Sequence, residues 1–337
     1  MKNYLRLTAI FTNEARITGE HGHYYPAALK VINQALKKID NDDNRFVALT
    51  MKTGVLLSQH EFQKALDLGK TALKLNRYNA HIYGALVDAY VELGDYDNAV
   101  LMADQMVHIR PDLRSYARIS YLREIHGDVK GAKKAMQLAV DAGVPTLEQT
   151  AWTRLNLGKL YQNYGDLQKA ENEYNKILAF REDYPFAIAA LAGIEMEKEN
   201  FKNAEALLHQ ATAIIPEVSF YEQLAVLYQK TNREKDFNKI IPTIFEMLKD
   251  DELHGHNVDL QYASIYFNLL KNYDKALESC QKEYAKRPQN IDVNRMLAQI
   301  YFAKSDYQKA AQHAKVAART GSVHPELIDV KALLAER

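Results

Sequence analysis

Histidines occur twice in this chain as pairs around a single glycine, at His21 and His23 and again at His254 and His256. Imidazole is a common metal ligand, but a metal site needs three or four ligands. No cysteine lies near either pair, and the pattern predicts loops at both places. We therefore interpret all four as solvated loop histidines, and the sequence indicates neither a metal nor a cofactor.

Carboxylates gather at Glu195, Glu197 and Glu199, with Asp183 nearby. General acid–base catalysis needs a carboxylate pair in an apolar cleft with shifted pKa values. These four lie at a predicted helix end beside a turn, so we expect a solvated charged face. Cys280 falls inside a predicted helix, which favours a buried thiol over a nucleophile. Without a G-x-S-x-G, phosphate-loop or H-E-x-x-H motif, the sequence predicts no enzyme.

The composition narrows the classes of partner. The 337 residues include 43 basic and 43 acidic side chains, so the net charge gives no sign of nucleic-acid binding. No apolar run is long enough to predict a membrane-spanning helix. The start, MKNYLRLTAIF, lacks the features of a signal peptide. The chain as it stands therefore predicts a cytoplasmic protein, and an exported or lipid-anchored one if an upstream signal was removed. Oligomeric state stays open.

Apolar residues recur at helical spacing in segments separated by short turns, which predicts pairs of amphipathic helices. The segment from Ala80 to Pro111 carries the clearest pattern, with landmarks at Tyr83, Leu86, Tyr90, Gly94, Asp95, Tyr96 and Ala99. Alanines then recur 34 residues apart, as at Ala65 and Ala99, Ala170 and Ala204, and Ala276 and Ala310. This pattern and period resemble the tetratricopeptide repeat (TPR).

The resemblance implies an all-α, right-handed superhelical solenoid of about nine helix pairs, with a polar capping helix at its end. Alanine or glycine at the contact between paired helices lets them cross closely, and tyrosines fill the gap to the next pair. We expect a single solenoid over residues 1–337, with repeats at about 9–45, 46–79, 80–112, 113–150, 151–184, 185–217, 218–256, 257–290 and 291–323 and a cap at 324–337.

Two places depart from regular repeats. In the first repeat, the second helix is expected to begin near Tyr25 and Pro26, with proline in the first turn. In the seventh, Phe237 replaces the small residue and Pro242 falls inside the second helix, which should separate the helices and kink or shorten the second. A loop, DDELHGHN, is expected next. We therefore predict that the last two repeats and the cap are partly uncoupled from the first six.

In the family, first-helix side chains line the concave face. The resemblance places there, as peptide-groove candidates, Arg118, Tyr121, Trp152, Asn156, Lys159, Gln223, Gln261, Tyr262 and Arg295. Trp152 is the sole tryptophan and occupies a groove position, unless it packs on the preceding loop. The Lys/Asn/Arg clamp of chaperone-binding members is not reproduced. Several stretches, including ARITGEHGHYYPAALKVINQAL, resemble a bacterial multi-repeat group with many exported or lipid-anchored members.

These features predict a non-catalytic scaffold for protein–protein interaction. An extended peptide or partner helix would lie in the concave groove, with its apolar anchors buried there. The alternative is a sensor or assembly subunit that acts through its ends or its convex face, including by self-association. An apolar concave groove favours the first reading, and a bare apolar patch on the terminal repeats favours the second.

Overall fold

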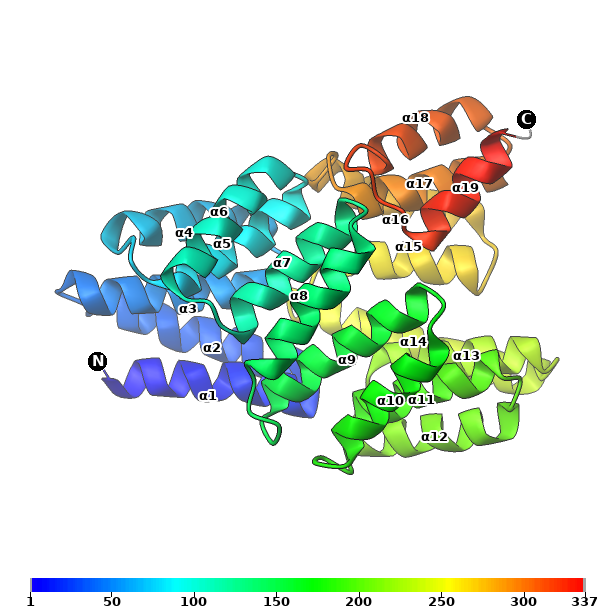
Figure 1. Ribbon diagram of the computed structural model, residues 1–337, viewed down its shortest axis with the longest axis horizontal. Coiled ribbons are helices and arrows are strands. Elements are labelled where there is room, and N and C mark those ends of the chain that lie inside the picture. The colour runs from blue at the N-terminus through cyan, green and yellow to red at the C-terminus, as the bar shows by residue number, and fades with distance from the viewer. Residues whose placement is uncertain (1, 336–337) are drawn as a thin grey trace.

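The computed structural model of the protein describes residues 2–335, and within them the chain forms nineteen α-helices and no strand (Figure 1). The predicted all-α class is confirmed. In chain order the helices are α1 (Lys2–Thr18), α2 (His21–Leu36), α3 (Asp42–Ser58), α4 (Phe62–Leu75), α5 (Ala80–Leu93), α6 (Tyr96–Ile109), α7 (Leu113–Ile125), α8 (Val129–Asp141), α9 (Glu148–Asn163), α10 (Leu167–Leu178), α11 (Pro185–Glu197), α12 (Phe201–Ile214), α13 (Val218–Lys230), α14 (Glu234–Leu253), α15 (Asp259–Asn268), α16 (Tyr273–Lys286), α17 (Ile291–Ala303), α18 (Tyr307–Ala317) and α19 (Pro325–Ala335).

Short turns reverse the chain between neighbouring helices, and the turn between α5 and α6 shows how. Gly94 ends α5 in the left-handed region, at φ 81°, where a side chain would be strained. Asp95 follows and accepts a hydrogen bond from the backbone N–H of Asn98, which caps α6. The same glycine–aspartate pair makes the turns at Gly127-Asp128 and Gly165-Asp166.

The core runs along the solenoid between successive helices. The alanines at the 34-residue spacing, including Ala65, Ala99, Ala170 and Ala204, are fully buried. Larger side chains fill the remaining space. Tyr174 of α10 is the largest that is completely enclosed, and it packs beside Gly158 of its paired helix α9. Because the small residues allow close helix contact, this arrangement agrees with the spacing argument. No helix within the described residues has the length and apolarity to cross a membrane.

The seventh helix pair differs from what its sequence led us to expect. Pro242 lies inside α14 without shortening it, and at 20 residues α14 is the longest helix described. Much of the expected loop is helical, because α14 continues to Leu253 before a turn at Gly255. Phe237 is partly buried and packs against the apolar clusters on both sides of α13. The bulky ring is therefore accommodated within the apolar core.

The expectation of solvated loop histidines was wrong for three of the four, because His21 and His23 lie inside α2 and His256 is buried. His21 is the first residue of α2 and is only partly exposed, and His256 is buried. His23 and His254 are exposed. Because α2 begins at His21, Pro26 lies beyond its first turn, inside the helix, and not at its start. The sequence pattern placed this helix start too late because no capping side chain marks it; Glu20 makes no cap hydrogen bond.

The solenoid turns back on itself, so that helices from its two halves touch. In Figure 1, α16 and α17 lie beside the ends of α5 and α6, far from them in the chain. We call these contacts the closure. One edge is formed by residues 59–60 and 92–96, and the other by residues 254–257, 287–291 and Arg319. The last helices therefore have a second attachment to the first half, in addition to their stacking on the seventh pair.

Candidate functional site

The inner face of the solenoid contains two cavities, of about 990 Å³ and 690 Å³. We call them the first and second cavity. Both are bordered by Ser58, His60, Asp88 and Glu92, so they adjoin at the closure. Volumes of this size are typical of sites that hold a small molecule or a few residues of a bound chain. The closure therefore forms part of the wall around the concave surface.

Five of the nine predicted groove residues line the first cavity: Arg118, Tyr121, Trp152, Asn156 and Lys159. They come from the first helices of consecutive pairs, α7 and α9, as the family resemblance implied. The indole of Trp152 is 43% exposed and meets Phe186 of α11 edge-on, with ring centroids 5.8 Å apart. Trp152 therefore contacts a neighbouring helix and keeps nearly half of its surface open to the cavity.

Lys159 is one turn beyond Asn156 on the same face of α9. Its Nζ lies 5.7 Å from the centroid of the Trp152 ring, within the range of a cation–π contact. It makes no hydrogen bond or ion pair in the part of the chain that is described. Burial lowers the pKa of Lys159, and the more distant carboxylate of Glu217 opposes that shift. Asn156 uses its amide N–H to bond the backbone carbonyl of Trp152, at 2.8 Å.

Arg118 also lines the first cavity, but its guanidinium is already engaged. It forms two hydrogen bonds with the carboxylate of Asp88, at 2.8 and 2.6 Å, and one with the carbonyl of Gly84 at 3.0 Å. Tyr121 is 38% exposed, and burial, with the nearby carboxylates of Asp292 and Glu92, raises its pKa well above the usual value. Its phenol therefore stays neutral and can donate a hydrogen bond.

The other four predicted residues are dispersed. Gln261 and Arg295 line the second cavity, where Arg295 is paired with Asp292 at 2.7 Å and with Glu326. Gln223 and Tyr262 line neither cavity. Tyr262 stacks on Phe245 of α14 with ring centroids 6.0 Å apart. The nine candidates thus divide into one group at the first cavity, two residues at the second and two elsewhere.

Carboxylates without cationic partners face the same hollow. Glu222, in the wall of the second cavity, makes no hydrogen bond or ion pair among residues 2–335. Burial and repulsion from Glu217 raise its pKa to about 7. Burial likewise raises the pKa of Glu217 and of Glu124 at the first cavity. The two cavities thus contain an unpaired lysine together with carboxylates whose charged form would be stabilised by hydrogen-bond donors.

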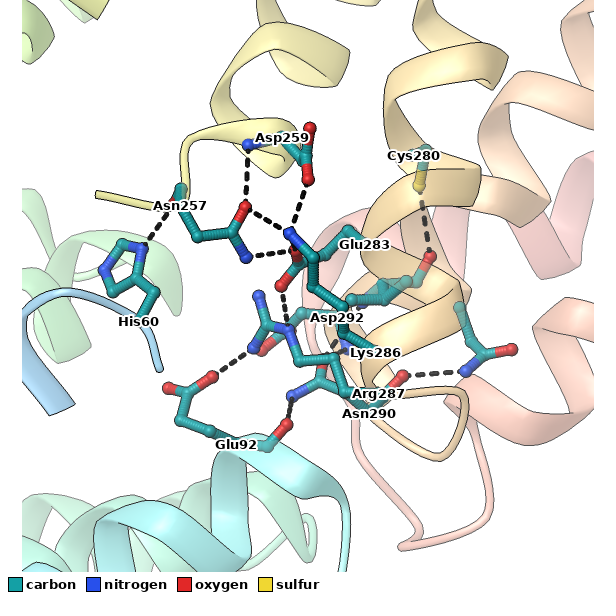
Figure 2. A network of polar contacts seen from close by, with 12 residues as sticks. His60, Glu92, Asn257, Asp259, Cys280, Glu283, Lys286, Arg287, Asn290 and Asp292 are labelled. Carbon is teal, nitrogen blue, oxygen red and sulfur yellow. Dashed lines mark hydrogen bonds and ion pairs between the residues drawn. The ribbon is translucent and has the colours of Figure 1, made fainter. Parts of the chain in front are cut away.

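The closure is built on Arg287, as Figure 2 shows. Its guanidinium, buried after α16, forms ion pairs with Glu92 of α5 and with the buried Glu283 of α16. The amide of Asn290 donates to the carbonyl of Glu92 at 2.9 Å, and the backbone N–H of Ile291 donates to the hydroxyl of Tyr96 at 2.9 Å. These groups satisfy one another across the contact, which is what a buried polar interface requires.

A second part of the closure involves the turn after α14. The backbone N–H of Asn257 donates to the carbonyl of Gln59 at 3.2 Å, and the carbonyl of Asn257 bonds the Nδ1 of His60 at 2.8 Å. The Asn257 side chain bonds Glu283 at 2.6 Å and Lys286 at 2.8 Å. This turn therefore connects the first half of the chain with the network around Arg287 (Figure 2).

The remaining chemical candidates lie outside the hollow. Glu195 is held by Lys198, Asn200 and Asn203, and these hydrogen bonds lower its pKa, opposite to what an acid catalyst needs. Cys280 is fully buried, as predicted, and burial raises its pKa to about 12. Within the described residues, no group of three or more His, Cys, Asp or Glu side chains is placed to hold a metal ion.

Sequence reasoning missed the closure and the residues that form it. Glu92 and Arg287 are 195 positions apart and belong to different repeats of the pattern. A repeat pattern specifies contacts between neighbours, and nothing in it says which distant repeats meet. One available signal was Asn290. Its side-chain oxygen caps α17, and the sequence pattern offered no partner for its side-chain amide N–H, which bonds the carbonyl of Glu92. Sequence reasoning also did not recognise that the carboxylates of Glu217 and Glu222 are close enough to repel each other.

Comparison with known proteins agrees with this architecture. Residues 56–123 and residues 153–184 match models of the tetratricopeptide repeat family. No curated protein sequence matches the chain. Among solved structures, the chain is similar to one in the APC/C hetero-tetramer Cut9–Hcn1, with 15% identity and a TM-score of 0.52 over 91% of this chain and 59% of that one. The present chain thus spans about three-fifths of that relative's length.

A second similar structure is a thermophilic TPR protein from Thermus thermophilus, with 21% identity and a TM-score of 0.50 over 58% of this chain and 98% of that one. Identities this low speak for the fold alone. The two segments that match the family models show that the chain is a tetratricopeptide repeat protein. The buried small residues at the repeat spacing and the continuous helical solenoid agree with this.

Proposed function

We propose that this protein is a non-catalytic scaffold that holds an extended segment of a partner protein along its inner face, in the first cavity. The TPR fold is that of a protein–protein interaction scaffold, and partners are therefore proteins. The proposal rests on one observation, the half-exposed indole of Trp152 in a cavity of about 990 Å³. Aromatic anchors in such hollows dominate the free energy of many interfaces.

The groups around Trp152 favour a peptide segment. Lys159 offers an unpaired cation that would bind a backbone carbonyl or a carboxylate, and Tyr121 offers a hydroxyl donor. Glu222 in the second cavity offers an unpaired acceptor. An extended chain has carbonyls and N–H groups in alternation, so it can satisfy both kinds of group while one bulky apolar side chain contacts the indole.

Arg118 and Arg295 take a different role in this proposal than in the prediction from sequence. Both are already paired with carboxylates, so they shape the walls and are poor candidates for direct contact. Tyr262 packs on α14, outside the cavities, and is not part of the proposed site. The proposed contact residues are therefore Tyr121, Trp152 and Lys159, with Glu222 at the far end.

Fluorescence tests the proposal directly, because Trp152 is the sole tryptophan of the chain. Partners captured from the source cells by the wild-type protein are titrated against it, and the emission of Trp152 is followed. We expect a change on binding, and we expect Trp152→Ala to weaken the affinity by about 2 kcal/mol or more. Tyr78→Ala is the matched control, since Tyr78 is an aromatic that is 81% exposed and lines neither cavity.

Equal affinities of wild type and Trp152→Ala for a captured partner would contradict binding in the first cavity. The next surface to test would be α1, where Leu7, Ile10 and Ile17 are exposed. Far-UV circular dichroism of both variants confirms that a lost affinity is not a lost fold.

A further inference from the structure

Histidines from three separate segments meet at the edge of the closure, where His21 of α2 lies beside His60 and His256. The ring of His256, in the turn after α14, lies with its centroid 5.5 Å from that of His21 at the start of α2. The ring of His60, between α3 and α4, lies 6.2 Å from it, and Tyr25 of α2 lies 5.5 Å from it. None of these residues is needed by the function proposed above. They lie between the two halves of the solenoid, so the contacts of His256 with the other rings exist only while the two halves touch.

His256 is bonded on one side only. Its ring hydrogen-bonds the backbone carbonyl of Ser58, while Nδ1 is buried and has no partner among the described residues. A carbonyl accepts, so the nitrogen that faces Ser58 carries a proton. Burial lowers the pKa of His256, so Nδ1, which has no acceptor, is the unprotonated nitrogen. The buried ring is therefore neutral. A second proton on Nδ1 would create a buried cationic N–H without an acceptor. This protonated state is costly in the closed structure, because the N–H cannot form the hydrogen bond that water would give it.

We propose that His256 is a pH-sensitive latch: when it binds a second proton, the turn at residues 254–257 separates from α2 and from the turn between α3 and α4, and the closure opens beside both cavities. The opened state hydrates the imidazolium, and the closed state cannot. The contacts that would be lost include the hydrogen bond from Asn257 to the carbonyl of Gln59.

The direction of the pH effect follows from the surroundings of His256. Burial, and then the proximity of His60, lower its pKa to about 4 from the ordinary 6.5. A group whose pKa is lowered in the closed state binds protons more readily when open, so acid favours opening. This contribution to the stability of the closure is complete above about pH 6.5 and is lost as the pH falls from there toward about 4.

The other histidines act in the same direction, with more compensation. Burial lowers the pKa of His21 and of His60, while the carboxylate of Asp251 partly offsets both shifts. Around His60, Arg287 lowers the pKa further and Glu283 raises it. His256 is the ring for which no carboxylate contributes to the shift, which is why the latch is assigned to it.

Several neighbouring groups oppose or surround the latch. His254 is close to Asp250, with a nitrogen–oxygen distance of 3.5 Å, and adds a further cation when charged. Burial raises the pKa of Asp251, and raises that of Glu92 to about 7 despite its ion pair. These two acids favour the closed state as the pH falls. The effect of His256 must therefore be measured as a difference between the wild type and a variant.

Small-angle X-ray scattering of the full chain at pH 7.5 and pH 5.0 provides the measurement. His256→Gln keeps an N–H donor for the carbonyl of Ser58 and cannot become charged in this range. His209→Gln is the matched control, since His209 is exposed on α12 and remote from the closure. The open population of the wild type should rise by up to about tenfold per pH unit for the one proton on His256. The radius of gyration should therefore increase more in the wild type and His209→Gln than in His256→Gln.

An equal change with pH in the wild type and His256→Gln would overturn the proposal, as would a wild type whose shape is the same at both pH values. If circular dichroism shows that His256→Gln does not fold at pH 7.5, His60→Gln replaces it with the same expected direction. That opening admits a partner rests on the function proposed above. Scattering is measured without a partner, so failure of the latch and failure of groove binding are distinguishable.

Discussion

Glu92 and Arg287 lie 195 positions apart, yet their side chains form an ion pair across the inner side of the solenoid. Arg287 simultaneously binds Glu283, and both of these residues are buried. A linear stack of repeats would hold α16 and α17 only through their neighbours. The pair instead joins the last helices to α5. It therefore forms an additional wall of the concave surface, at the place where the two cavities adjoin.

Arg287→Ala should therefore destabilise the protein more than the loss of an ordinary surface arginine. Removing the guanidinium takes the closest cationic partner from the buried carboxylate of Glu283, which keeps only the amide of Asn257 and the more distant Lys286. Breaking a buried ion pair typically costs about 3–5 kcal/mol. Urea denaturation monitored by circular dichroism measures the change. Arg233→Ala is the control, because Arg233 also binds two carboxylates but at the surface, and should change little. Similar effects of both variants would mean that the closure adds little stability.

Two glycines in equivalent turns offer a matched test of the closure. Gly94 and Gly165 have nearly the same backbone, at φ 81° and 82°. A Cβ at Gly165 would meet nothing within 4 Å, whereas one at Gly94 would come within 2.3 Å of the carbonyl of Gln289 across the closure. Gly165→Ala should cost about 1 kcal/mol from backbone strain alone. Gly94→Ala should cost clearly more, and thermal denaturation compares the two.

If the two alanine variants had the same melting temperature, the close approach of Gln289 to Gly94 would not exist in solution. A larger loss confined to Gly94→Ala would support the closure, because the strain from the left-handed backbone is common to both positions.

The helices and their packing could be predicted because they depend on local pattern. The 34-residue spacing of Ala65, Ala99, Ala170 and Ala204 reflects contacts between adjacent helices, and each of these alanines is fully buried. The glycine–aspartate turns followed from backbone conformation and capping. The placement of Trp152 on the inner face followed from its offset within the repeat, and the structure puts it in the first cavity.

What could not be predicted depends on the accumulated rotation from one repeat to the next. That rotation decides whether Arg287 reaches Glu92, and no local pattern encodes it. The histidines show the same limit: His256 is buried because a segment nearly 200 residues earlier covers it. Pro242 misled for another reason, since a proline inside a helix can be tolerated without ending it, as α14 shows.

Overpacking the contact between paired helices should destabilise the solenoid. Ala170→Leu or Ala204→Leu places extra methylene and methyl groups where the alanine has no exposed surface, at a cost of roughly 1–3 kcal/mol. Lys169→Ala next to it removes an exposed side chain and should change little. Chemical denaturation of the three variants checks the register, and equal effects from all three would contradict the assignment of Ala170 and Ala204 to the helix contact.

Native-state hydrogen exchange should find the least stable helix at α14. Pro242 has no N–H to donate to the carbonyl of Asn238, and Phe237 is only partly buried where other repeats have an enclosed alanine. Amides of residues 237–253 should therefore open more often than those of residues 151–216, which belong to helices with fully buried small residues.

The closure modifies this expectation for the helices that follow. In the wild type, residues 287–303 should remain protected despite a weak α14, because Glu92, Tyr96 and Gly94 hold that edge independently. In Arg287→Ala, exchange should accelerate at residues 287–303 and stay unchanged at residues 151–216. Equal protection of residues 237–253 and 151–216 in the wild type would show that Phe237 and Pro242 do not weaken the seventh pair. Uniform acceleration in the variant would mean that the closure and the repeats open as one unit.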